Sequence, residues 1–175
     1  MAIAHVQTGK NSASVGTDRD AAVTLTLTAG NILVLIGAWV AGPSFTSIAA
    51  TGVTFTQLGT QITTGGGNPQ RMYYAENIPG GSTTMTFTVS AGNGFPTLIV
   101  SEFSGVKTSA SQDTGAGTNG GPSTAANSGT TATRDTADEV LVVGVMRTRR
   151  RPVPMSGRAD SLCRRMGRRT MAILS

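Results

Sequence analysis

The chain has 175 residues, of which 13% are charged and 5% aromatic, and it contains 23 glycines and 27 threonines. A chain of this length can form one domain, or one domain with an appendage, and bury a substantial core. Threonine fits a pleated sheet and glycine fits turns, whereas Lys and Glu, which favour helices, are scarce. The composition therefore excludes a mainly helical protein and predicts an all-β fold.

The net charge of +5 is unevenly distributed along the chain. Residues 1–146 carry five basic and eight acidic residues, a net charge of −3, whereas residues 147–175 carry nine arginines and one aspartate, a net charge of +8. We therefore divide the chain into a mildly acidic domain, 1–146, and a basic C-terminal tail, 147–175.

Short apolar segments separated by turn signals predict about seven β-strands. Residues 22–28 alternate strictly, so their aliphatic side chains share one face and their threonines the other. Residues 32–40 are almost continuously apolar, which predicts a strand at the centre of the fold. The other predicted strands are 53–58, 71–75, 84–89, 97–103 and 139–146. In the strand at 84–89, Met85, Phe87 and Val89 are expected to point inward.

Loops rather than helices connect these segments, which predicts an antiparallel β-sandwich of the jelly-roll type. Residues 107–136 contain almost no large apolar side chain, so we expect a long exposed loop or a weakly ordered segment. A loop of this length is uncommon in a compact domain and suggests a role in contacts.

The N-terminus lacks the pattern of a signal peptide, and the longest apolar run, 32–40, has about half the length needed to span a bilayer. The single cysteine, Cys163, lies in the tail, so the chain has no partner for an intrachain disulfide. We expect a protein that is not secreted by the usual route and has no membrane partner.

Three interpretations of the tail stay open. Its arginines could bind nucleic acid or an acidic partner, and those concerned are Arg149, Arg150, Arg151, Arg164, Arg165, Arg168 and Arg169. The tail could instead be a disordered extension, or the product of a reading-frame shift in a GC-rich gene. Read in a shifted frame, codons 155–162 permit Val-Gly-Ala-Gly-Gly-Phe-Thr-Leu, a strand with turn glycines. In that case the domain would lack its native closing strands and expose a sheet edge.

The reactive residues argue against an enzyme. His5 is the only histidine, so no Cys/His zinc site can form, and we interpret it as an ordinary residue of a first strand. The loop acids Asp18 and Asp20 lack the spacing of a calcium loop. Glu76, directly after the predicted strand 71–75, and Glu102, in the predicted strand 97–103, are the candidate acids for glycoside hydrolysis, and nothing in the sequence pairs them. We expect no catalytic residue, no metal and no cofactor.

Flat aromatic side chains are the residues that stack on sugars, and three are candidates. Trp39 ends the most apolar strand, which predicts a place in the core. Tyr73 and Tyr74 are neighbours in a predicted strand, so one of them must face outward. These two tyrosines are the candidate ligand-binding or interface residues.

Three blocks resemble a β-sandwich module that recurs in structural proteins of tailed phages and prophages and in some bacterial surface proteins. The blocks are Val23-Thr24-Leu25 with Ala29-Gly30-Asn31-Ile32-Leu33-Val34, then Glu102-Phe103-Ser104-Gly105, and finally Thr136-Ala137-Asp138-Glu139-Val140-Leu141-Val142-Val143-Gly144. They span about residues 5–146. Members usually end with a glycine-rich Phe-Thr strand, and this chain departs from that pattern where its arginines begin.

The resemblance implies no shared catalytic residues. It implies a phage virion structural protein, a capsid decoration or tail-associated component that assembles with other virion proteins and as a homo-oligomer. One alternative is a carbohydrate-binding or adhesin module with a glycan as its partner. A second alternative is nucleic-acid contact, which we expect only through the arginine tail.

Overall fold

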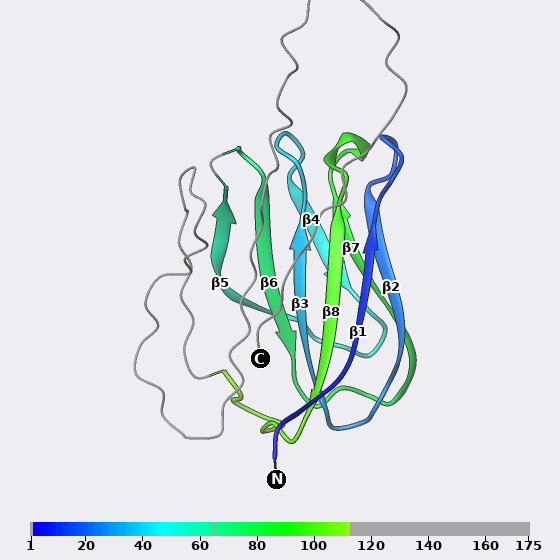
Figure 1. Cartoon of the computed structure of the whole chain (residues 1–175), viewed down its shortest axis with the longest axis vertical. Helices are drawn as coiled ribbons and strands as arrows, with labels where there is room; N and C mark the ends of the chain where they lie inside the picture. Colours follow the sequence, from blue (N-terminus) through cyan, green and yellow to red (C-terminus); the bar gives the residue numbers. More distant parts are fainter. Residues whose placement is uncertain (1, 65, 113–175) are drawn as a thin grey trace, which may run out of the picture.

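The computed structural model describes residues 2–64 and 66–112, and they form a two-layer β-sandwich (Figure 1). The elements are β1 (Ala4–Ser12), β2 (Asp20–Leu27), β3 (Ile32–Ala38), β4 (Phe45–Ala49), β5 (Thr56–Thr63), β6 (Pro69–Ala75), β7 (Gly81–Val89), a 3-10 turn η1 (Gly92–Gly94) and β8 (Thr97–Ser104). No helix among these residues is long and apolar enough to cross a membrane. The predicted strand at 139–146 lies outside the described residues.

The strands pair as a rolled-up hairpin. One sheet has five strands in the order β1-β8-β3-β6-β5, and the other has three in the order β2-β7-β4. The antiparallel pairs β1–β8, β2–β7 and β3–β6 are nested inside one another, as in a jelly roll. The innermost pair of a complete jelly roll would be β4 with β5, but these two strands do not pair. Strand β4 pairs with β7 in the smaller sheet, whereas β5 pairs with β6 at the edge of the larger sheet. The predicted antiparallel, jelly-roll-like sandwich is confirmed.

Five of the predicted strands coincide with β2, β3, β6, β7 and β8, but the prediction was wrong around β4 and β5. The strand expected at 53–58 lies at 56–63, because Val53 belongs to a turn in which it bridges Ala50. The strand at 45–49 was not predicted. It is only five residues long, pairs on one side and contains a bulge, so it has no clear alternation to detect. No range was predicted for β1, but its position confirms the interpretation of His5 as a residue of a first strand.

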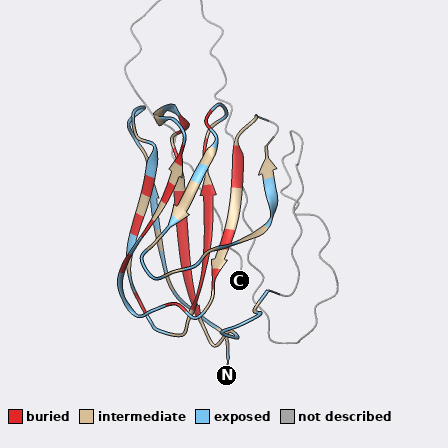
Figure 2. Ribbon diagram, turned by 180° about the vertical axis from the view of Figure 1, so that it is seen from behind, coloured by how far each residue is buried: buried red, intermediate tan, exposed pale blue. Residues whose placement is uncertain are grey.

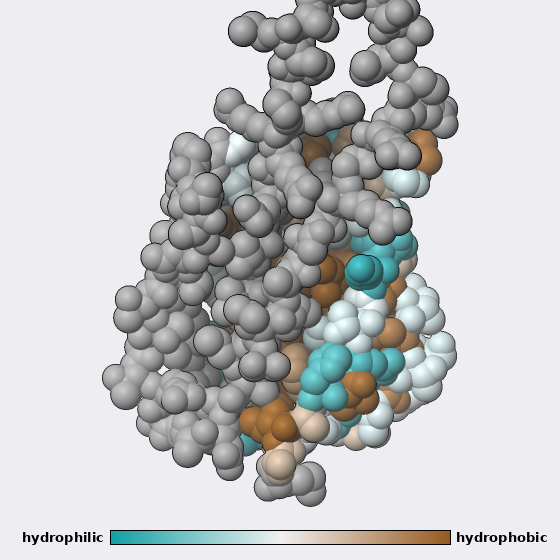
Figure 3. Space-filling model, in the orientation of Figure 1, coloured by the Kyte–Doolittle hydropathy of each residue, from teal (hydrophilic) through white to brown (hydrophobic). Residues whose placement is uncertain are grey.

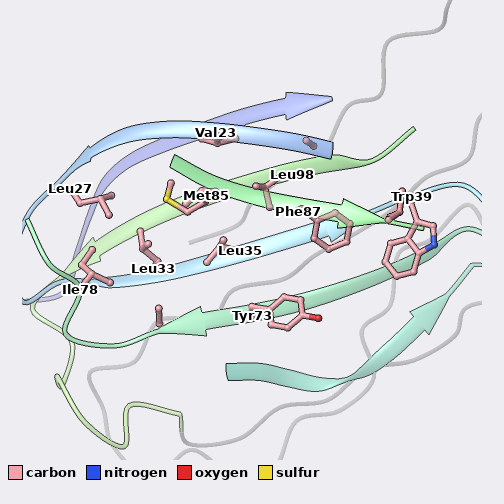
Figure 4. Packing of buried hydrophobic residues seen from close by; sticks show 14 residues of the cluster. Val23, Leu27, Leu33, Leu35, Trp39, Tyr73, Ile78, Met85, Phe87 and Leu98 are labelled. Carbon is pink, nitrogen blue, oxygen red and sulfur yellow. The ribbon is translucent and has the colours of Figure 1, made fainter. Parts of the chain in front are cut away.

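The core lies between the two sheets (Figure 4). Met85, Phe87 and Val89 point into it and are fully buried, as the alternation predicted. Trp39 is 1% exposed and packs 5.6 Å from the ring of Phe87, which confirms its expected place in the core. Figure 2 shows nearly unbroken burial along β3 and β8, and buried and exposed residues in turn along β2 and β7.

A glycine lets the sheets approach closely at the centre of the core. A Cβ atom at Gly37 in β3 would stand 2.2 Å from Cε2 of Phe87 in β7. The aromatic ring therefore occupies the space that a side chain at Gly37 would fill. Only glycine is compatible with this arrangement unless Phe87 moves.

Candidate assembly surfaces

Neither candidate tyrosine presents a free ring. Tyr73 points into the core, is 5% exposed and stacks on Phe45 at 5.7 Å between ring centroids. Its hydroxyl has no hydrogen-bond partner among residues 2–64 and 66–112. Tyr74 points to the opposite face, as expected for neighbours in a strand, and is partly buried against Ile32, Val34 and Phe103.

His5 lies at the exposed edge strand β1. Its Nε2 is 2.7 Å from the Thr8 hydroxyl, and its ring meets the Phe103 ring edge to face at 5.4 Å. The structure places no group of three or more His, Cys, Asp or Glu side chains close enough to hold a metal within its described ranges. The seven candidate arginines of the tail and Cys163 lie outside those ranges.

The four acidic side chains in the described ranges have separate hydrogen-bond partners. The Asp20 carboxylate accepts a hydrogen bond of 2.6 Å from the Thr88 hydroxyl, and Asp18 accepts a longer one of 3.4 Å from the backbone of Val15. The Glu76 carboxylate accepts two hydrogen bonds from Ser111, one from its hydroxyl at 2.6 Å and one from its backbone N–H at 2.5 Å. The hydrogen bond from the Ser111 hydroxyl, with that from its backbone, lowers the pKa of Glu76.

Glu102 is a fully buried acid at one end of the core. Strand β8 turns its side chain inward, where Oε2 accepts from Gln7 at 2.5 Å and Oε1 accepts from the Thr28 backbone at 2.9 Å and from Asn31 at 2.7 Å. Burial alone raises the pKa of Glu102, but these hydrogen bonds outweigh it and hold the pKa below its usual value. The carboxylate thus ties β1 and the turn between β2 and β3 to β8.

Sequence reasoning missed this role, because the three donors are separated from Glu102 by 71 to 95 residues along the chain. The only signal available was an acid inside an otherwise apolar strand. A buried carboxylate that accepts hydrogen bonds from three donors fixes the segments that supply those donors in place.

The outer face of the three-stranded sheet is built from small hydroxyl side chains, and we call it the threonine face. It is formed by Thr24, Thr26, Thr84, Thr86 and Thr88. These residues alternate with the buried apolar residues of β2 and β7, so they point away from the core. Thr24 and Thr84 are direct cross-strand partners whose hydroxyl oxygens are 2.7 Å apart. Asp20, at the end of β2, is the only charged residue in strands β2, β4 and β7.

The outer face of the five-stranded sheet has the opposite character, and we call it the aliphatic face. It is formed by Ile32, Val34, Ile36, Ile99 and Phe103. These side chains alternate with inward-pointing residues of β3 and β8, yet each is at most 8% exposed. Figure 3 looks onto this side, with apolar residues near its centre and polar residues toward the β1 edge where described atoms are visible.

A third feature lies at the open side of the sandwich, where β6 faces the edge strand β4. The Arg71 guanidinium carbon stands 4.4 Å from the centre of the Phe45 ring, a cation–π contact. The Nε of Arg71 also donates a hydrogen bond of 3.1 Å to Gln61 in β5. These contacts fix Arg71 in place over the aromatic end of the core.

Comparison of the chain with protein-family models, with curated proteins and with solved structures finds no match. The surfaces are therefore interpreted from their own geometry and chemistry.

Proposed function

We propose that the chain is a bacteriophage virion structural protein, a capsid decoration or tail-associated component, which acts by protein–protein assembly. The observation that carries this proposal is the threonine face, a surface of small hydroxyl side chains with a single charge, Asp20, at its margin. The resemblance of three sequence blocks to phage structural modules points in the same direction.

The threonine face is suited to docking on another rigid surface. Threonine and alanine lose little side-chain entropy when they are covered, in contrast to Lys, Glu or Arg. The hydroxyls of Thr24 and Thr84 form a hydrogen bond with each other, and the Thr88 hydroxyl donates one to Asp20. These polar groups therefore keep a hydrogen-bond partner when docking removes water from the face. The face therefore costs little to bury and still stays soluble when it is free.

The size of the face indicates multivalent docking. Strand β2 has eight residues. A strand of this length is about 27 Å long, and three strands are about 14 Å wide, which gives roughly 400 Å². A standard stable interface uses about 800 Å² from each partner. One threonine face is too small for tight binding alone, so we propose that the protein docks as an oligomer, whose linked contacts add up.

The test is co-sedimentation with particles. Particles from cells that produce the protein are separated on a density gradient, and the protein is followed by immunoblotting. The protein is expected in the particle fraction, and Thr84→Lys is expected to release most of it by placing a charge in the docked face. The matched control is Val15→Lys, because Val15 is 54% exposed in the loop between β1 and β2 and belongs to no strand of this face.

Two results would reject the proposal. A protein found only as a free monomer would remove the assembly role. Equal release by Thr84→Lys and Val15→Lys would show that net charge, rather than the threonine face, governs the contact.

The positions of the two tyrosines do not support the glycan-binding alternative. The ring of Tyr73 is inside the core, and Tyr74 is packed into the aliphatic face. The nucleic-acid alternative rests on arginines outside the described residues.

A further inference from the structure

The aliphatic face is an apolar surface that crosses four strands, and Ser101, which pairs with Val34, is a polar residue within it. Ile32 pairs with Phe103 and Ile36 pairs with Ile99, so β3 and β8 contribute side by side. Strands β6 and β5 extend the surface through partly buried residues, because Met72 pairs with both Ile36 and Leu58. A solvated outer sheet face would carry polar residues at these positions, as the threonine face does.

The burial of this face requires a covering layer. Ile36 and Phe103 are each 3% exposed, whereas the outward threonines Thr24 and Thr84 are exposed. Of the described strands none lies over the aliphatic face, because the second sheet packs against the inner side of the first. Val106 is the one described residue beyond the strands that packs on the cluster of Ile32 and Phe103.

The chain leaves β8 on the correct side to supply that layer itself. After β8, Val106 packs onto the cluster at the outer face. Ser111 is then fixed by two hydrogen bonds to Glu76, the residue that follows β6. The segment between them therefore runs past the end of the five-stranded sheet, below β6 in Figure 1.

The longest apolar run in the sequence beyond this point is 140–146, Val-Leu-Val-Val-Gly-Val-Met. Residues 113–139 separate it from the described part and are rich in Gly, Ser and Thr. For a chain of that length and composition the average end-to-end distance is on the order of 30 Å. This reach is comparable with the length of a strand, so the run can arrive anywhere on the aliphatic face.

We propose that residues 140–146 of the same chain dock on the aliphatic face and bury Ile32, Val34, Ile36, Ile99 and Phe103. The hydrophobic effect drives the contact, since both surfaces are apolar and neither carries a charge at its centre. The aliphatic face is then occupied by the chain itself and is not a surface for other proteins. This inference does not depend on the proposed virion role.

The first test uses the unmodified full chain. Hydrogen–deuterium exchange is followed by mass spectrometry on peptides from 115–135 and from 140–146. If 140–146 is docked, its amides exchange about tenfold more slowly, or slower still, than those of the linker. Equal exchange in the two segments would overturn the proposal.

The second test locates the contact. In a Cys163→Ser background, Val34→Cys is combined with Val142→Cys or Val143→Cys and treated with a short bismaleimide. A cross-link within one chain is expected in at least one combination. The matched control places the partner cysteine on the threonine face, as Thr84→Cys, and is expected to give none.

Two outcomes of the cross-linking contradict the proposal. Cross-linking to Thr84→Cys as efficient as to Val34→Cys would mean that the segment has no fixed place. Cross-links between two differently tagged copies, and none within a chain, would assign the aliphatic face to a second copy of the protein.

Discussion

The buried carboxylate of Glu102 makes the sharpest prediction, and Glu102→Gln is the change that tests it. The amide retains one oxygen, which can still accept from Thr28 and Asn31. Its NH2 group replaces the oxygen that accepts from Gln7. Gln7 can turn its own oxygen toward the new amide only by giving up its 2.7 Å hydrogen bond to the backbone of Thr26.

The magnitude follows from this exchange of partners. A hydrogen bond to a charged group contributes about 1.5 to 3 kcal/mol, and the two surviving bonds weaken because their acceptor becomes neutral. The amide is less costly to bury than the carboxylate, which offsets part of the loss. We expect Glu102→Gln to lower the free energy of unfolding by about 2 to 3 kcal/mol at pH 7.

The pH dependence gives a second, independent signature. The pKa of Glu102 in the folded protein lies below its usual value of 4.5. The carboxylate therefore contributes stability above that pH, and this contribution is lost as the pH falls through the folded-state pKa. The difference in stability between the wild type and Glu102→Gln should be full at pH 7 and should shrink below about pH 4.5.

Urea unfolding followed by tryptophan fluorescence measures both effects, because Trp39 is the only tryptophan and is buried in the core. The matched control is Glu76→Gln, an acid whose pKa is also lowered but whose position is outside the core. Its effect is expected to stay within about 1 kcal/mol. Equal stability of Glu102→Gln and wild type at pH 7, or a difference that persists unchanged to pH 3, would refute the reasoning.

Three further predictions address the core and the tail. Gly37→Ala should lower the free energy of unfolding by about 3 kcal/mol, because its Cβ would overlap Phe87, whereas Gly16→Ala, with its nearest atom at 3.7 Å, should be nearly neutral. Similar urea midpoints for the two variants would mean that the sheets do not meet at Gly37. Tyr73→Phe should leave stability unchanged or raise it by up to about 1 kcal/mol, because the buried hydroxyl has no partner among the described residues. A clear loss of stability in thermal unfolding would show that the hydroxyl is paired. Deletion of residues 147–175 removes a net charge of +8 and should abolish any salt-sensitive binding to DNA, measured by fluorescence anisotropy. Binding that survives the deletion would place the nucleic-acid contact elsewhere.

Local patterns in the sequence were sufficient for the fold class and for much of the core. The alternation of threonine with aliphatic residues in β2 and β7 assigns each residue to a face, because a strand has a period of two. The inward positions of Met85, Phe87 and Val89 follow from that period alone. The unbroken apolar run of β3 also indicated a strand that is buried on both faces of its sheet. The run did not indicate which segment covers the outer face.

The pairing of strands could not be predicted in the same way. Strands β1 and β8 are neighbours, yet their residues are about ninety positions apart, and no local pattern encodes such a partner. The sequence likewise required one of Tyr73 and Tyr74 to face outward, and only the register of β6 against β3 and β5 decided which one.

The amino-acid sequence by itself thus determined that the chain forms half-buried strands, where its apolar faces lie and where its positive charge is concentrated. Only the tertiary structure decided which strands meet, that Glu102 is enclosed by three distant donors, and that one outer face is polar and the other apolar. The physical reason is that alternation and propensity act over a few residues, whereas strand order and burial depend on contacts between segments that are far apart in the chain.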